Sequence, residues 1–242
     1  MKKEPTILSD LDLRRFDDQI SNEAIGIVGQ ETLRYSPVVV QGLCGIGIAA
    51  MRCLLAAGVG EVIVIDDKEI TAKMLPSQTL FGLDDIGKLR CIAAREKQMG
   101  GTLDDSLKLY NTQLNETNID RLIGNAKIII KTSWETEFDS NMFDMIDSRD
   151  LYLIGAFGRE WRGVFGTYSQ EKKDRFRELY TNLYLQNKNS FNEDSNCFSF
   201  VSNFIGAAIA SAAIKILLNL ESFIDSTFYK VDLFNPQLIK IL

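Results

Sequence analysis

A strand, a glycine-rich turn and a helix follow one another directly from residue 37, and this order constrains the fold more than any other feature. The apolar run at 37–41 predicts a buried strand, and GLCGIG follows it at 42–47. An alanine- and leucine-rich helix then ends at Gly58, and a second apolar run, EVIVID, occupies 61–66. Such strand-helix-strand units join parallel strands by a right-handed crossover. The sequence therefore predicts a sheet that begins parallel.

The same alternation continues along the chain as far as residue 157. Further strands are expected at 107–111, 127–132 and 151–157, with helices at 85–98, 118–124 and 138–146. This pattern predicts an α/β, Rossmann-like fold in which a mixed, mostly parallel sheet has helices on both faces.

The two ends of the chain differ from this pattern. Residues 9–21 predict an amphipathic helix capped by Ser9 or Asp10, joined by a glycine-containing link at 25–36. Beyond Arg159 we expect a turn and an antiparallel strand, a polar stretch with helical spacing only at 176–186, and a hydrophobic helix at 201–220 before two final strands. We interpret the chain as one domain, 1–242, with the parts 1–36 (N-terminal helix and arm), 37–168 (nucleotide-binding core), 169–197 (crossover loop) and 198–242 (C-terminal helix and strand pair).

Composition excludes several classes of function. The net charge of −6 provides no broad basic surface for nucleic acid. The chain has no histidine, which excludes imidazole chemistry, and its four cysteines form no CxxC pair, so no metal site follows from them. Without a run of 18 apolar residues or a signal peptide, no membrane contact is expected, and the protein is predicted to be cytoplasmic.

The glycine turn is the candidate nucleotide site. Gly42, Gly45 and Gly47 would let a phosphate approach the backbone at the start of the helix, and Asp66 ends the next strand, where an acidic side chain commonly accepts bonds from ribose. Alternatively, the glycines only permit close packing of strand and helix, and Asp66 caps a surface loop. The turn and Asp66 would also suit an NAD-dependent oxidoreductase, although no catalytic lysine, tyrosine or histidine set is recognisable.

A longer stretch of sequence resembles the ThiF/MoeB and ubiquitin-activating-enzyme family. The segments RRFDDQI, GLCGIG, AAGVG, VIVIDDKEI, MLPSQ and DIGKLR occur in the order and spacing of that family's motifs over about 90 residues. The resemblance implies binding of ATP and Mg²⁺ and adenylation of the C-terminal carboxylate of a small ubiquitin-like or sulfur-carrier protein or a peptide. It also implies a homodimer or a heterodimer with a related chain.

Several positions depart from the motifs where the family has its catalytic groups. Asp18 and Ser77 replace arginines, Met74 replaces an asparagine, and Trp134 replaces a magnesium-binding aspartate. Losing one such cation costs on the order of 100- to 1000-fold in rate. We consider whether Lys73 substitutes for the missing arginine, and Glu135 or Glu137 for the metal ligand.

Other positions keep the family's chemistry. The resemblance assigns Gln78 and Lys88 to the nucleotide site and Arg90 to the place of a catalytic lysine. Arg14 and Arg15 either reach a partner's site or are solvated charges.

The four cysteines are expected to be reduced thiols. Cys197 lies in a polar loop, where it is expected to be accessible and where family members can carry a cysteine that bonds covalently to the carrier; otherwise it is a bystander. Cys44, Cys53 and Cys91 are interpreted as small apolar fillers.

The leading hypothesis is an adenylating protein that holds the tail of a carrier over the carboxyl edge of the sheet, either as an active enzyme or as the degenerate half of a two-chain enzyme. A non-catalytic scaffold that docks peptides or mediates dimerisation is the main alternative, and an oxidoreductase is the third.

Overall fold

One mixed sheet organises the computed structural model, which describes residues 7–98, 106–132, 143–144, 146–149, 151–168, 178, 197–220 and 228–240. Among these residues the strand order is β3-β2-β1-β4-β5-β6-β7-β8. Strands β3, β2, β1, β4 and β5 pair in parallel with their neighbours, whereas the pairs β5–β6, β6–β7 and β7–β8 are antiparallel. The bounds are β1 Pro37–Gln41, β2 Glu61–Ile65, β3 Leu107–Tyr110, β4 Ile128–Lys131, β5 Tyr152–Arg159, β6 Arg162–Tyr168, β7 Phe228–Asp232 and β8 Gln237–Lys240. The predicted Rossmann-like sheet with an antiparallel C-terminal part is confirmed.

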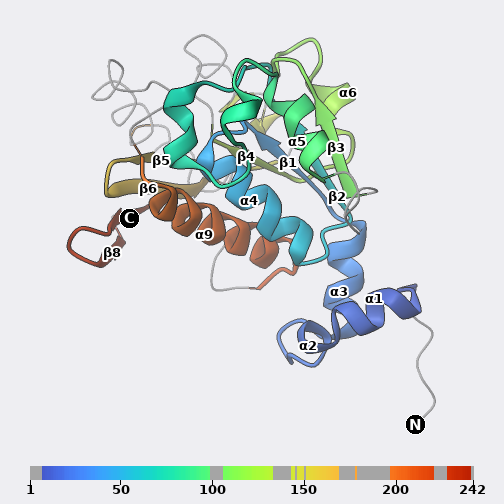
Figure 1. The fold of residues 1–242 in the computed structure, drawn as a ribbon. Helices are drawn as coiled ribbons and strands as arrows, with labels where there is room; N and C mark the ends of the chain where they lie inside the picture. The colour runs from blue at the N-terminus through green and yellow to red at the C-terminus, as the bar shows by residue number, and fades with distance from the viewer. Residues whose placement is uncertain are drawn as a thin grey trace.

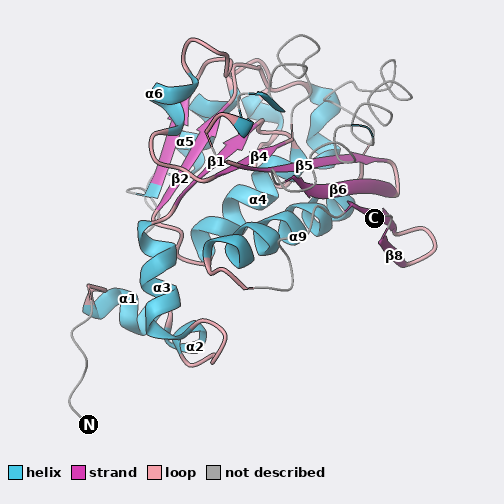
Figure 2. Cartoon of the chain, turned by 180° about the vertical axis from the view of Figure 1, so that it is seen from behind, coloured by secondary structure: helices cyan, strands magenta, loops and turns pink. Residues whose placement is uncertain are grey.

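Helices cover both faces of this sheet, as predicted. Helices α4 (Gly45–Ala56) and α9 (Ser199–Leu217) lie side by side against one face (Figures 1 and 2), and α5 (Arg90–Gln98) contributes to the same core. Helix α6 (Ile119–Ile123) packs on the other face. Along β1, Val38 and Val40 join the first core and Val39 the second, because alternate side chains of a strand point to opposite faces. This is why β1, β2 and β4 are apolar except at their first or last residue.

Helix α9 is the most apolar long element among the residues described. By length and composition alone it could cross a membrane, and half of it is buried in this structure. It packs along α4 and against β5 and β6, and Gly206 lies so close to α4 that a Cβ there would be 2.4 Å from that of Ala49. Its hydrophobic character therefore serves the protein core.

The N-terminal segment differs from the prediction in two ways. The single helix expected at 9–21 is broken at Phe16 into α1 (Asp10–Arg15) and α2 (Asp17–Ile20), although Ser9 caps α1 as expected. The link expected at 25–36 is a helix, α3 (Gly26–Tyr35). Gly29, one of the two glycines of the expected link, lies in the helix at a closely packed position, since a Cβ there would lie 3.3 Å from Leu218 Cδ2.

The helix expected at 85–98 is shorter than predicted, and two other expected segments lie largely outside the described residues. The helix expected at 85–98 begins only at Arg90, because Leu83–Asp85 forms a separate 3₁₀ helix, η2, and Gly87 has φ +85°. Most of the helix expected at 138–146 and of the polar stretch 169–197, including its expected helix at 176–186, lies outside the described residues.

Candidate functional site

The candidate site lies at the carboxyl ends of β1 and β2, where the chain turns into α4. Gly42 has φ +101°, a conformation that favours glycine, and its N–H donates to the Ile65 carbonyl at 3.0 Å. Cys44 is the N-cap of α4, and its side chain makes no capping hydrogen bond. The first N–H groups of a helix attract anions, so this turn is suited to a phosphate or carboxylate.

The other two glycines of the turn are needed because neighbouring atoms are too close for a side chain. A Cβ at Gly47 would lie 1.9 Å from the Gly42 carbonyl oxygen, and one at Gly45 would lie 1.9 Å from the Ser77 carbonyl oxygen. Both glycines therefore permit close packing. This packing also places the start of α4 at the edge of the sheet, which is what nucleotide binding would require.

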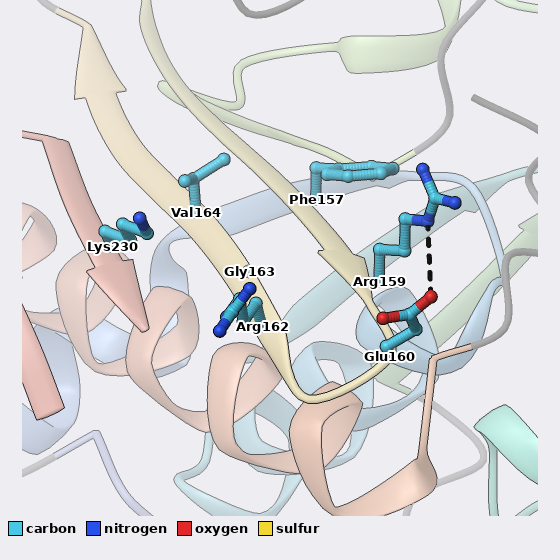
Figure 3. Close-up of a pocket in the computed structure, with 7 residues that line it drawn as sticks. All are labelled: Phe157, Arg159, Glu160, Arg162, Gly163, Val164 and Lys230. Atoms are coloured by element: carbon cyan, nitrogen blue, oxygen red, sulfur yellow. Dashed lines mark ion pairs between the residues drawn. The ribbon is translucent and has the colours of Figure 1, made fainter. Parts of the chain in front are cut away.

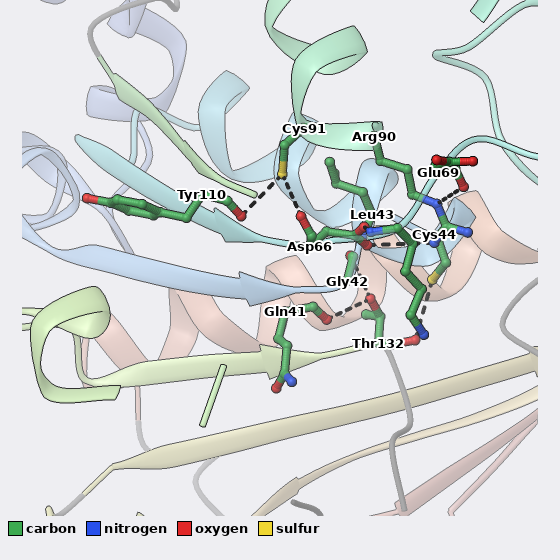
Figure 4. A network of polar contacts seen from close by, with 11 residues as sticks. Gln41, Gly42, Leu43, Cys44, Asp66, Glu69, Arg90, Cys91, Tyr110 and Thr132 are labelled. Carbon is green, nitrogen blue, oxygen red and sulfur yellow. Dashed lines mark hydrogen bonds and ion pairs between the residues drawn. The ribbon is translucent and has the colours of Figure 1, made fainter. Parts of the chain in front are cut away.

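Asp66 fastens the turn to the end of β2 (Figure 4). Its Oδ2 accepts the Leu43 N–H at 2.6 Å and its Oδ1 accepts the Lys68 N–H at 2.8 Å. The carboxylate is 5% exposed, and burial raises its pKa, opposed by the Arg90 charge and the two backbone donors. Asp66 thus holds the turn together through both of its carboxylate oxygens.

Arg90 is buried beside Asp66 rather than exposed to a phosphate. Its Nη1 lies 3.6 Å from Asp66 Oδ2, and its Nε donates to the Glu69 carbonyl at 3.1 Å. Lys88 forms ion pairs with Asp85 and Glu96 at 3.2 and 3.1 Å. These two cations are therefore neutralised within the chain.

The 3₁₀ helix η1 (Ala72–Ser77) carries the substituted motif. Met74 is buried, and the Ser77 hydroxyl donates to its carbonyl at 2.8 Å. The Gln78 amide closes the following turn by donating to the Phe81 carbonyl at 3.0 Å and accepting the Phe81 N–H at 2.7 Å. Lys73 is exposed and is the cation of η1 that solvent or a ligand can reach.

Cys197 contradicts the expectation of an accessible thiol. It is 5% exposed, forms a β-bridge with Glu160, and accepts a bond from the Ser202 hydroxyl at 3.5 Å. Burial raises its pKa to about 11, which disfavours the reactive thiolate. The polar sequence before Cys197 predicted a loop, whereas Cys197 itself pairs with Glu160 at the β5–β6 turn.

The other cysteines largely agree with the filler interpretation. Cys91 is buried and donates to the Asp66 carbonyl at 3.2 Å, and burial raises its pKa to about 12. Cys44 and Cys53 are half-buried, and the Cys44 thiol lies 3.5 Å from the Thr132 carbonyl oxygen.

The proposed metal ligands cannot be placed. Trp134, Glu135 and Glu137 lie outside the described residues. Within the part that is described, no group of three or more acidic or cysteine side chains is arranged to hold a metal ion.

The arginines near the N-terminus lie on α1. Arg15 stacks on the Phe16 ring at 4.7 Å and donates to the Leu55 carbonyl at 3.4 Å, whereas Arg14 and Asp18 are exposed.

The sequence interpretation missed the polar residues at the ends of β1 and β4. The Thr132 hydroxyl lies 3.1 Å from the Gln41 carbonyl and 2.9 Å from that of Gly42, so it ties the glycine turn to β4. Lys131 and Gln41 are register partners, both buried, on the other face of the sheet from α4. In the sequence, Gln41 and Lys131 are polar residues at the end of otherwise apolar runs, and this pattern could have identified them.

Comparison with known proteins gives a family and a fold. Residues 16–242 match the ThiF family. The chain is 25% identical over 223 residues to the probable molybdopterin-synthase adenylyltransferase of Porphyra purpurea, covering 89% of this chain and 57% of that relative. It therefore spans less than two thirds of that relative's length.

Two solved structures share the fold. A crystal structure of PaaA has a TM-score of 0.80 at 16% identity, covering 98% of this chain and 84% of that one. E. coli MccB crystallised with ATP has a TM-score of 0.69 at 19% identity, covering 97% and 79%. At these identities the likeness concerns architecture.

Proposed function

The chain belongs to the ThiF family, and we propose that it binds ATP at the glycine turn and adenylates the C-terminal carboxylate of a small ubiquitin-like or sulfur-carrier protein or a peptide, as one subunit of a dimeric activating enzyme. The observation that carries this proposal is the start of α4, without a capping bond from its N-cap residue Cys44, held beside Asp66 at the carboxyl edge of the sheet. An adenylyltransferase relative and a fold shared with an ATP-bound structure support it.

The geometry of the turn fits a nucleotide. The helix start offers N–H groups and about half a positive elementary charge to a phosphate. Asp66 lies at the end of β2, where a ribose would be received. ATP supplies the adenylyl group, and the chain's own task is to hold the phosphates and the incoming carboxylate in line while water is excluded.

The charges explain why we propose a subunit rather than a self-sufficient enzyme. Adenylation brings a carboxylate against a triphosphate, so cations must offset the accumulating negative charge. Arg90 is paired with Asp66, and Lys88 is paired with two carboxylates, which leaves Lys73 as the exposed cation on η1. A related chain would supply the remaining positive charge.

A non-catalytic scaffold is the second candidate. Met74, Ser77 and Gln78 are all buried, and the two polar ones serve internal hydrogen bonds, as expected if the nucleotide motif has become structural. Membership of the ThiF family favours adenylate chemistry over hydride transfer with NAD.

Calorimetric titration of the purified chain tests nucleotide binding without knowledge of the carrier. MgATP is expected to bind with micromolar affinity, and NAD should give no heat. Lys73→Glu should weaken MgATP binding by about tenfold, equivalent to about 1.4 kcal/mol. The matched control is Lys240→Glu, the same reversal at an exposed lysine of β8.

Each outcome decides between the candidates. Absence of heat up to millimolar MgATP would overturn the nucleotide proposal and favour the scaffold. Binding that is unchanged in Lys73→Glu would remove Lys73 from the site.

A further inference from the structure

A groove on the antiparallel part of the sheet is separate from the glycine turn. It has a volume of about 440 Å³ and is lined by residues of β5, β6 and β7 and the β5–β6 turn (Figure 3). Gly158 and Gly163, on the same strands, approach Ile205 of α9, so the alternate residues Phe157 and Val164 face away from that helix. The groove is thus on the sheet face opposite α9.

Its lining combines an apolar floor with positive charge. Phe157, Val164 and Lys230 are register partners on three neighbouring strands, and Arg159 is the register partner of Arg162. Along β5, Phe157 and Arg159 are two positions apart, so their Cα atoms are separated by about 6.6 Å at 3.3 Å per residue. An extended peptide repeats its side chains at the same spacing.

The groove contrasts with the chain as a whole, which has a net charge of −6. Three cations and one carboxylate, Glu160, line it. The Arg159–Glu160 pair is long, at 3.9 Å between exposed groups, and such pairs contribute little. Arg162 is held by Asp232 at 2.8 Å, whereas Lys230 forms no ion pair with any residue that the structure describes.

We propose that this groove binds an extended acidic peptide segment of a partner protein. Its carboxylates pair with Lys230 and Arg159, and an apolar side chain two residues away lies on Phe157 and Val164. An apolar floor between cations favours a peptide over a nucleic acid, whose phosphates offer nothing to fill it. The groove uses no residue of the glycine turn, so the inference is independent of nucleotide binding.

The groove lies near the carboxyl ends of the parallel strands. Strand β5 runs parallel to β4, and Lys131 at the end of β4 pairs with Gly155, so Phe157 and Arg159 extend beyond the end of β4. The groove is therefore at the same edge of the sheet as the glycine turn.

Fluorescence anisotropy with the full chain tests the proposal. The probe is a fluorescein-labelled octapeptide of alternating glutamate and leucine, with two comparison peptides in which lysine replaces glutamate or serine replaces leucine. The glutamate–leucine peptide should bind saturably, and more tightly than either comparison peptide. Binding should weaken with added salt, because the Debye length falls from about 10 Å at 0.1 M to about 3 Å at 1 M.

Two charge reversals on the same hairpin complete the design. Lys230→Glu should weaken peptide binding by about tenfold. Lys240→Glu should leave it within about twofold, because Lys240 pairs with Tyr229 and so belongs to the opposite sheet face. Both lysines are exposed, so neither variant should disturb folding.

Two kinds of result in the anisotropy experiment would contradict the peptide proposal. Absence of saturable binding, or equal losses in the two variants, would overturn the proposal. Equal binding of the glutamate–serine peptide, or displacement by sodium triphosphate at equal concentration, would reduce the groove to a simple anion site and overturn the peptide assignment.

Discussion

Substituting Gly47 by alanine tests whether close packing at the glycine turn positions the start of α4. The new Cβ would lie 1.9 Å from the Gly42 carbonyl oxygen and 2.8 Å from the Thr132 hydroxyl. An ordinary C···O contact is about 3.3 Å, so α4 or the turn must move by about 1.4 Å. Because backbone cannot give way as a side-chain end can, the cost should reach the upper end of the overpacking range, about 3 kcal/mol.

Urea unfolding followed by circular dichroism measures this cost. With a slope of about 3 kcal/mol per molar urea, the midpoint should fall by about 1 M. Gly82→Ala is the matched control, since Gly82 also has a negative φ and the nearest atom to a new Cβ is 4.0 Å away. It should stay within about 0.5 kcal/mol of the parent chain.

The same variant connects packing to binding. Displacement of the helix start should abolish MgATP binding by Gly47→Ala even where the protein remains folded, whereas Gly82→Ala should bind normally. A midpoint for Gly47→Ala equal to that of Gly82→Ala would refute the steric reasoning.

Three further predictions follow from the buried polar groups. Asp66→Asn should cost about 3 kcal/mol in urea unfolding, because it leaves the Arg90 charge without its buried partner; a loss below about 0.5 kcal/mol would contradict the ion pair. The Gly82 N–H and the Lys97 and Lys88 ammoniums lower the Asp85 pKa from 3.8 to about 2. The stability that Asp85 contributes is therefore present above about pH 4 and lost as the pH falls toward about 2. Asp85→Asn should flatten the dependence of unfolding free energy on pH in that range, and an unchanged dependence would disprove the role of the Asp85 carboxylate. Iodoacetamide at pH 8 should modify Cys197 at least about 100-fold more slowly in the native protein than in urea, as followed by mass spectrometry, and comparable rates would show that the thiol is accessible.

The sheet could be predicted because its strands follow strong local rules. The apolar runs that became β1, β2 and β4 are short and are each bounded by turn residues, which favours strands buried on both faces over helices. Helix α3 was missed because Gly26 and Gly29 disfavour a helix locally, whereas its buried residues Gly29, Gln30 and Leu33 pack against the rest of the protein. Tertiary packing outweighed propensity at that position.

The candidate site was predicted in outline, but the pairing of its charges was not. A sequence shows that Arg90 and Lys88 are cations near the turn, and it cannot show which carboxylates face them. Asp66 is 24 residues from Arg90, and the two meet because residues 68–70 pair through backbone hydrogen bonds with residues 88–90. Cys197 was misjudged for the same reason, since its bridge to Glu160 joins segments far apart in the chain.

The proposed adenylation requires the protein both to neutralise a triphosphate and to hold a polypeptide, and the charges suited to these two tasks lie in different places. Around the glycine turn, Arg90 and Lys88 are paired with carboxylates of the same chain, so among these groups a bound triphosphate would meet the helix start and the exposed Lys73. On the β5–β7 groove, by contrast, Lys230 forms no ion pair with the described residues and Arg159 is only weakly held. A chain built in this way is better equipped to hold a polypeptide than to neutralise a reacting phosphate. We therefore infer that the adenylation proposed at the turn depends on cations from a second chain, and that peptide binding should persist where that chain is absent.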